Sequence, residues 1–166
     1  MKKMNLLVVA MIAVLPAVSQ AQDVQTFVGA NYEHGSVHVG SSSTSMDGVK
    51  FQAGSQLKWG TLKGTAATLS GEGAEYDNYS VAVEKPFNIE QSNVFISPEA
   101  GITYTHFEND AFNNSDFGLM AGASAGYNFN KQFQIVSNYN HSFGMKPHQD
   151  NIDEDSVSVG LNYRFN

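Results

Sequence analysis

The chain of 166 residues is acidic, with 16 Asp and Glu against 9 Lys and Arg, which excludes nucleic-acid binding by electrostatic attraction. It contains no cysteine, so it has neither a disulfide framework nor a residue that could carry a lipoprotein's lipid. Gly and aromatic residues are abundant, which favours strands and turns. We therefore expect one small β-rich domain.

The first 21 residues have the pattern of a secretory signal peptide. A basic start at residues 1–3 precedes an apolar run at residues 6–15 and small residues at 19–21. The run would rise only about 15 Å as a helix, about half of the hydrocarbon thickness, which is too short for a permanent anchor. No later segment approaches 18 consecutive apolar residues, which excludes helical membrane spans. We expect residues 1–21 to be cleaved and residues 22–166 to form a single domain.

The remaining sequence alternates between apolar and polar residues in eight segments. A period of two is typical of strands, because consecutive side chains point to opposite faces. In the last segment, Val157, Leu161 and Phe165 are apolar, whereas Ser158 and Asn162 are polar. The third segment is the weakest, and its outward face stays undefined. In chain order, the expected strands cover residues 24–34, 49–58, 61–70, 79–85, 94–107, 117–129, 133–143 and 156–165.

The expected connections alternate in length. Short links lie near residues 59–60, 86–93 and 130–131, and longer polar loops cover residues 35–48, 71–78, 108–116 and 144–155. Short periplasmic turns and long extracellular loops are typical of bacterial outer-membrane barrels. Strands of about ten residues, tilted near 40°, span about 25 Å, which matches the apolar band of such barrels. The sequence therefore predicts an all-β fold, an eight-stranded antiparallel up-and-down transmembrane β-barrel with both termini in the periplasm.

Charges and aromatic residues are also polarised along the expected barrel. Most Lys and Arg fall near the short turns, and most Asp and Glu fall in or beside the long loops. The alternative is a soluble barrel of the lipocalin type, which has its apolar face inside. The polar face here is rich in Gly, Ser, Asn and Thr, which favours the membrane barrel. Two aromatic girdles are expected, one from Trp59, Phe87, Phe129, Phe133, Tyr163 and Phe165 and the other from Tyr32, Tyr79, Tyr104, Tyr139 and Phe143.

Near the end of the chain, the polar residue Ser158 is followed two positions later by Gly160 and then by the aromatic residues Tyr163 and Phe165. This ending resembles the C-terminal signal of outer-membrane barrels, which implies that Gly160, Tyr163 and Phe165 are recognised by the barrel-assembly machinery. Asn166 departs from the pattern, since the aromatic residue usually comes last. The ending, the mature length and the strand layout together resemble the Ail/OmpX group and the transmembrane part of OmpA. The resemblance implies a surface protein in contact with outer-membrane lipid and lipopolysaccharide.

Eight strands leave an interior just wide enough for side chains to fill, so we expect no conducting pore. Charged residues that face this interior should be paired, because removing one partner of a buried pair typically costs about 3–5 kcal/mol. Glu33 is expected to pair with Lys50 across the first hairpin. A structural role for these charges is favoured over a catalytic one. The expected lumen charges are Glu33, Lys50, Lys58, Glu84, Glu99 and Arg164.

We expect no catalytic, cofactor or metal site. The acidic run at residues 150–155 could hold a divalent ion that bridges lipopolysaccharide phosphates, but it lacks a calcium-loop pattern. The histidines gather toward the long loops and could converge on a metal, but their spacing matches no ligand motif. They are His34, His38, His106, His141 and His148.

The leading hypothesis is a non-enzymatic surface protein whose four loops contact a host surface or another extracellular ligand. A purely structural membrane component is the alternative in the same class. A lipid A-modifying enzyme is the alternative in another class, because His141, Ser142 and Glu154 are similar to the His/Ser/Glu set of the lipid A deacylases. Adjacent strand residues point to opposite faces, however, which separates such a nucleophile from its base.

Overall fold

The computed structural model describes residues 24–39, 42–109, 113–144 and 152–165. In these ranges there is no helix of the length and apolar character needed to cross a membrane. The expected signal peptide, residues 1–21, lies outside them. The strands are β1 (Gln25–Val39), β2 (Ser42–Leu57), β3 (Gly60–Gly71), β4 (Ala74–Glu84), β5 (Phe87–Asn88), β6 (Val94–Glu108), β7 (Asn113–Asn128), β8 (Phe133–Gly144) and β9 (Ile152–Phe165).

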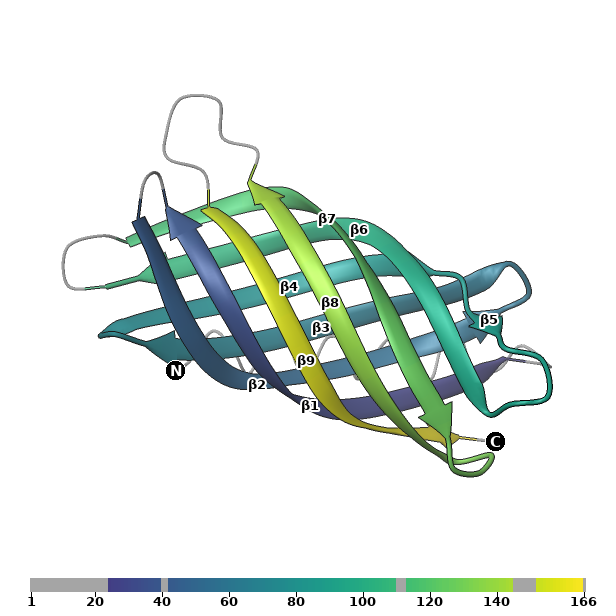
Figure 1. The fold of residues 1–166 in the computed structure, drawn as a ribbon. Helices are drawn as coiled ribbons and strands as arrows, with labels where there is room; N and C mark the ends of the chain where they lie inside the picture. Colours follow the sequence, from purple (N-terminus) through teal and green to yellow (C-terminus); the bar gives the residue numbers. More distant parts are fainter. Residues whose placement is uncertain (1–23, 40–41, 110–112, 145–151, 166) are drawn as a thin grey trace.

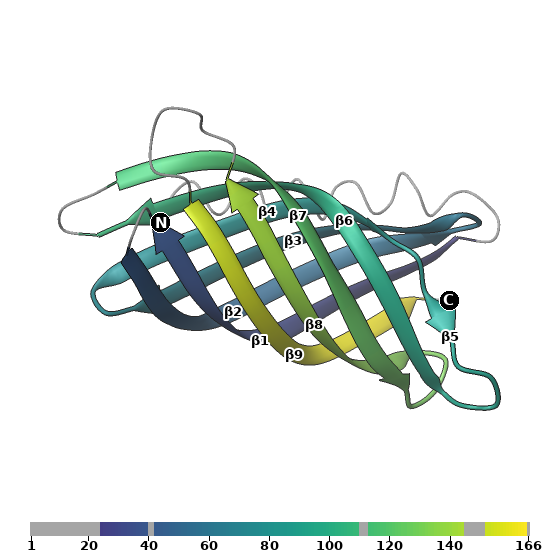
Figure 2. The same ribbon diagram turned by 45° about the horizontal axis from the view of Figure 1, so that its top comes forward.

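The strands form a closed antiparallel barrel (Figures 1 and 2). Each long strand pairs with its neighbours in sequence, and β1 pairs with β9 to close the sheet. The two-residue β5 lies in the connection between β4 and β6 and pairs with β6, while β4 also pairs directly with β6. Eight long strands therefore make the wall, and the predicted antiparallel barrel is confirmed.

The strands extend further than the sequence predicts. At one end of the barrel, β1 and β2 continue through most of residues 35–48, and β3 joins β4 through the turn at Glu72 and Gly73. Both turn residues have positive φ, 52° and 78°, a conformation that glycine adopts readily. The prediction of long loops at residues 35–48 and 71–78 is therefore wrong. We call this end the outer end and the opposite end, where β1 begins and β9 ends, the inner end.

The larger part of the wall, which we call the belt, has an apolar outer face. Phe117 and Ile102 are among its most exposed side chains, at 66% and 60%, and Leu161 follows at 55%. Aromatic side chains lie at both edges of this face, as predicted, and their rings contact each other across strands. The belt consists of residues 25–33, 49–57, 60–68, 79–84, 94–105, 117–128, 133–140 and 156–165.

The outer part of the wall, which we call the collar, has the opposite polarity. Most of its large inward side chains are apolar, with Asp116, Ser142 and Glu154 as buried polar exceptions, and most of its outward side chains are Ser, His, Asp or Glu. The sequence pattern changes sign where the strands pass from belt to collar, which is why these segments resemble polar loops in the sequence. The collar consists of residues 34–39, 42–47, 69–77, 106–109, 113–116, 141–144 and 152–155.

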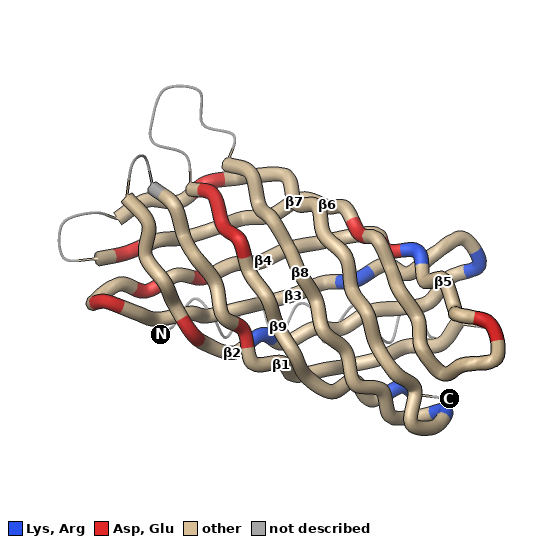
Figure 3. Tube along the Cα trace, viewed as in Figure 1, with Lys and Arg blue, Asp and Glu red and all other residues tan. Residues whose placement is uncertain are grey.

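Charge follows the same division along the barrel axis. Figure 3 shows Asp and Glu concentrated toward the outer end and most Lys and Arg toward the inner end. Glu90, in the connection before β6, is an acidic exception at the inner end.

Candidate functional site in the barrel lumen

An apolar plug fills the lumen inside the collar. Side chains from six strands pack together there, and Tyr76 and Met46 are completely buried. The Tyr76 hydroxyl donates to Glu154 Oε2 at 2.8 Å, and Asn78 Nδ2 donates to the same oxygen at 2.7 Å. Tyr76 of the plug therefore contacts a buried carboxylate that accepts two hydrogen bonds. It consists of Val37, Met46, Leu69, Ala74, Tyr76, Phe107 and Ile152.

Glu33 and Lys50 form a buried ion pair below the plug. Lys50 Nζ lies 3.0 Å from Glu33 Oε2, although the angle is not that of a hydrogen bond. In the register of the β1–β2 hairpin, Glu33 lies opposite Gly48 and Lys50 opposite Asn31, so the pair is diagonal. Glu154 interacts electrostatically with both residues. One lysine thus faces two carboxylates.

A second lysine faces two carboxylates nearer the inner end. Lys63 Nζ donates to Glu84 Oε2 at 3.1 Å and also to Glu99 Oε2. The Lys63 side chain is 3% exposed and that of Glu99 is completely buried. Burial imposes a desolvation cost on these charges, and their mutual attraction opposes it.

The sequence pattern predicts Glu84 and Glu99 in the lumen but leaves the facing of β3, and hence of Lys63, undefined. On β3, Lys63 and the apolar Leu69 both point inward, because the strand passes from belt to collar between them. Neither face of β3 is uniformly apolar for this reason. A signal was present in the alternation of Thr61, Lys63 and Thr65 within the belt part alone.

Two of the expected lumen charges form no ion pair in the described residues. Lys58 is exposed, because β2 ends at Leu57 and the inward–outward alternation stops at the turn. Its expected place in the lumen is therefore wrong. Arg164 is half-buried at the inner end of β9, where its Nη2 donates to the backbone oxygen of Asn130 at 2.9 Å.

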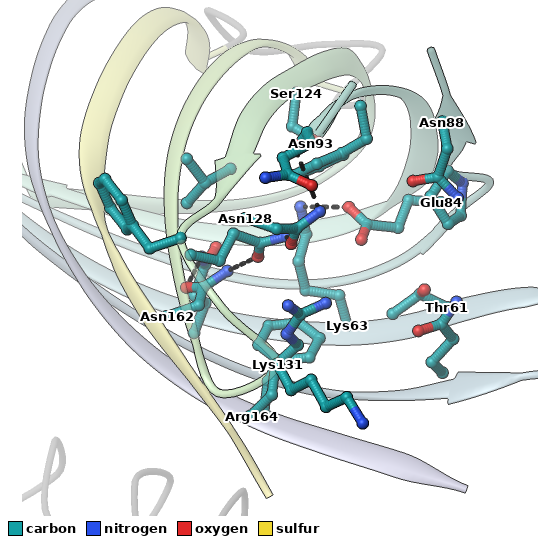
Figure 4. A pocket seen from close by; sticks show the side chains of 18 of the residues that line it. Thr61, Lys63, Glu84, Asn88, Asn93, Ser124, Asn128, Lys131, Asn162 and Arg164 are labelled. Atoms are coloured by element: carbon teal, nitrogen blue, oxygen red, sulfur yellow. Dashed lines mark hydrogen bonds and ion pairs between the residues drawn. The ribbon is translucent and has the colours of Figure 1, made fainter. Parts of the chain in front are cut away.

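The inner half of the lumen contains a polar cavity of about 520 Å³, which we call the vestibule (Figure 4). Lys63 and Glu84 line its deeper part, and Lys131 and Arg164 line it near the inner turns. Asn162 accepts a hydrogen bond from Gln52 Nε2 at 2.6 Å and donates to Gln134 at 2.8 Å. Gln134 Nε2 in turn donates to Asn128 Oδ1 at 3.2 Å, so side-chain amides are linked along the cavity wall.

Two phenylalanine rings enter the vestibule over glycines. Phe27 lies opposite Gly54 on β2, and Phe95 lies opposite Gly126 on β7. A Cβ atom at Gly54 would lie 2.6 Å from the Phe27 ring, so a larger residue would displace it. Glycine at these positions therefore allows inward aromatic rings in a narrow barrel.

Histidine–aspartate pairs lie on the outside of the collar. His34 Nδ1 lies 2.8 Å from Asp47, and His141 Nδ1 lies 2.8 Å from Asp155. Hydrogen bonds from His141 and Tyr139 hold the pKa of Asp155 below its ordinary value of 3.8. These contacts place polar partners just above the aromatic edge of the belt.

The other described histidines, His38 and His106, also have polar neighbours, and His38 shares Asp155 with His141. His106 Nδ1 contacts Ser115 Oγ at 2.8 Å, and His38 Nε2 is 3.9 Å from Asp155. In the ranges that the structure describes, no three His, Asp or Glu side chains are arranged to hold a metal ion. His148 and residues 150–151 of the acidic run lie outside those ranges.

The structure separates the deacylase-like set. His141 points outward to Asp155, whereas Ser142 is buried in the lumen and lies opposite Glu154. A hydroxyl nucleophile needs its base within hydrogen-bond reach, and this histidine lies on the other face of the sheet. The three residues therefore form no catalytic arrangement.

The C-terminal residues are part of the closing strand. Gly160 lies opposite Asn31, where a Cβ atom would collide with β1, and Tyr163 packs edge-on against Phe133 and Phe165 at centroid distances of 5.3 and 5.0 Å. These contacts give Gly160, Tyr163 and Phe165 a place in the folded wall.

A closed sheet with an apolar aromatic-edged belt outside and paired charges inside defines a transmembrane β-barrel. The chain belongs to the outer membrane protein beta-barrel domain family, whose model matches residues 6–165. No protein of curated function matches the chain.

Two solved barrels are similar in fold. Neisserial surface protein A shares 13% identity at a TM-score of 0.75, over 84% of this chain and 97% of that chain. Ail of Yersinia pestis, solved with the heparin analogue sucrose octasulfate, shares 18% identity at a TM-score of 0.61, over 87% of this chain and all of that chain (100%). At these identities the similarity establishes the fold of a small outer-membrane barrel.

Proposed function

We propose that the chain is a non-conducting surface protein of the outer membrane whose collar binds a cationic extracellular ligand. One observation carries the proposal. Among the described collar residues, the outward face has seven acidic side chains and no Lys or Arg. A surface of one sign attracts partners of the opposite sign and raises their association rate. The acidic residues are Asp47, Glu72, Glu75, Asp77, Glu108, Asp153 and Asp155.

The filled lumen supports the non-conducting part of the proposal. Tyr76 and Met46 have no exposed surface in the plug, and the Lys50 and Lys63 ion pairs occupy the middle of the lumen. An eight-stranded barrel is just wide enough to be filled by side chains. The outward collar is therefore the part of the protein that remains available to an extracellular partner.

The proposed ligand differs in charge from the compound bound to Ail. Sucrose octasulfate is a polyanion, and the acidic collar of this chain would repel such a ligand at low salt. A basic patch on an extracellular or host protein has the complementary charge. In an adhesion role this chain would therefore use a cationic partner, whereas the compound bound to Ail is anionic.

Proteoliposomes test this proposal without the charge of a bacterial surface. The barrel is refolded into phosphatidylcholine vesicles, and binding to poly-lysine and to heparin surfaces is measured at two salt concentrations. We expect binding to poly-lysine that weakens at high salt, and no binding to heparin.

A charge variant shows whether the collar carries the binding. Asp47→Asn, Glu75→Gln, Asp77→Asn and Glu108→Gln together should abolish it, whereas Glu90→Gln at the inner end should not. Unchanged binding by the collar variant would contradict the proposal and favour a purely structural membrane role. Conductance across a planar bilayer containing the barrel would contradict the non-conducting part.

We also propose that residues 1–21 direct export and that Gly160, Tyr163 and Phe165 direct assembly. The basic and apolar pattern of the first segment supports export. Sequencing the N-terminus of the protein from isolated outer membranes tests cleavage after Ala21. Replacing Phe165 by Ala should lower the amount of assembled barrel in cells while refolding in vitro remains possible.

A further inference from the structure

We propose that the vestibule binds a small carboxylate-bearing ligand from the periplasm. In this site Arg164 and Lys131 hold the carboxylate, and Gln52 and Asn138 accept hydrogen bonds from N–H or O–H groups of the ligand. The inference goes beyond the proposed surface function, because it concerns the opposite end of the barrel.

The vestibule has the size of a small-molecule site. Its volume of about 520 Å³ lies within the range of about 300–1,000 Å³ that is typical of ligand pockets. Lys63 and Glu84 line its deeper part, and the plug fills the lumen beyond them. In an outer-membrane barrel of this topology the short turns lie in the periplasm. A ligand would therefore enter from the periplasmic side.

Two buried amide oxygens in the cavity wall lack a donor. The Gln52 side chain donates to Asn162, but its Oε1 has no partner in the described residues. Asn138 Nδ2 donates to Ser158 Oγ at 3.1 Å, and its Oδ1 likewise has no partner there. Gln52 is 4% exposed and Asn138 is 2% exposed. Because buried acceptors are normally satisfied, these two oxygens favour a guest that supplies N–H or O–H donors.

Two cations near the inner turns lack an acidic partner in the described part of the chain. Arg164 Nη2 contacts only a backbone oxygen, and its Nε is buried without a partner. Lys131 is exposed at the β7–β8 turn, and Glu84 is already paired with Lys63. Figure 4 shows both side chains at the inner end of the cavity, with the Lys131 ammonium directed away from the Arg164 guanidinium. A guanidinium without an acidic partner is suited to a carboxylate.

The rest of the lining restricts the ligand class. Nine of the 20 lining residues are Asn or Gln, which can both donate to and accept from peptide groups. The Phe27 and Phe95 rings add apolar contact. The lining thus complements a short peptide with a free C-terminal carboxylate.

The test uses a matched pair of probes. N-acetyl-alanyl-alanine has the free carboxylate, and its C-terminal amide differs only in lacking that charge. Each is titrated into the barrel in phosphatidylcholine nanodiscs, and binding is followed by calorimetry and by NMR of the Asn and Gln side-chain amides. We expect millimolar binding of the acid, with shifts at Gln52 and Asn138, and binding of the amide that is about tenfold weaker or more.

Variants identify the anchoring groups. Arg164→Gln should weaken binding of the acid about tenfold. Lys131→Gln, in an exposed turn, provides a second test if the first variant does not refold. Lys58→Gln is the control, since Lys58 is a cation at the same end of the barrel that does not line the cavity. Equal binding of acid and amide, no shift of the cavity signals, or equal weakening by Lys58→Gln would overturn the proposal.

Discussion

The belt and the collar are built from the same continuous strands but have opposite polarity. In the belt, Leu62 on β3 faces outward, whereas seven residues later Leu69 faces inward and is 1% exposed. An outward apolar side chain is favoured where the surroundings are acyl chains, and an inward one where they are water. The comparison shows that the surrounding solvent, and not the strand itself, decides which face is apolar.

The two interiors differ as well. The belt interior contains Lys63 with Glu84 and Glu99, whereas the collar interior contains an apolar cluster around Tyr76. Charges inside the belt need partners, because they are buried away from bulk water. The collar has the polarity of a soluble lipocalin-type barrel, with its apolar side chains inside, and the belt has that of a membrane barrel. This protein combines the two arrangements along one axis.

Removing the cation of the belt interior should have the largest effect. Lys63→Met leaves Glu84 and Glu99 without their shared partner, and we expect it to destabilise the barrel by about 3–5 kcal/mol. Urea unfolding from phospholipid vesicles measures this loss. Lys58→Met, at an exposed turn, is the control and should change stability little. A loss below about 1 kcal/mol for Lys63→Met would mean that the belt interior does not depend on this ion pair.

The second prediction compares two leucines of β3. Leu69→Ala should cost about 2–5 kcal/mol, because it opens a cavity in the plug in addition to the lost transfer energy. Leu62→Ala should cost less, about 1–2 kcal/mol, because acyl chains fill the space that it leaves. The same urea titration compares them. Equal costs would contradict the difference in packing between collar and belt.

The third prediction places a charge on each outer face. Leu161→Lys puts an ammonium in the apolar face of the belt and should cost about 2–4 kcal/mol in phospholipid vesicles. Ser45→Lys, on the exposed outside of the collar, should have little effect. If the Ser45 variant were as unstable as the Leu161 variant, the boundary between collar and belt would lie further out than we place it.

The smallest expected effect is on the outside of the collar. Asp155 has a pKa below its ordinary value, so it contributes stability above that value and loses the contribution as the pH falls below about 4. Asp155→Asn should therefore lower stability at pH 7 by less than about 1 kcal/mol and flatten its decline in acid. Unfolding curves at pH 7 and pH 3 measure both changes. A decline in acid that is steeper in the variant would have the wrong sign.

The sequence predicts the belt well and the collar poorly. In β9, alternation from Val157 to Phe165 identifies the strand and its outward face, and the structure agrees. In β1, the alternation predicts an end at His34, although the strand continues to Val39. Alternation identifies a strand only while the apolar side chains stay on one face, and they change faces where the strand leaves the belt.

Individual charges show the same limit. Glu33 and Lys50 can be placed together from a hairpin, because the separation along two neighbouring strands sets their register. Lys58 is wrongly predicted in the lumen because the expected strand extends one residue too far. The facing of Lys63 stays undefined in the sequence because β3 contains the change of polarity.

By itself, the amino-acid order determined the class of fold, the number of wall strands and the outward face of the belt, because a period of two is a local property. Only the tertiary structure decided which lysine pairs with which carboxylates. It also decided where the apolar plug forms and where the vestibule stays open. These features depend on the stagger of strands around a closed barrel, which brings together side chains such as Tyr76 and Glu154 from distant parts of the chain.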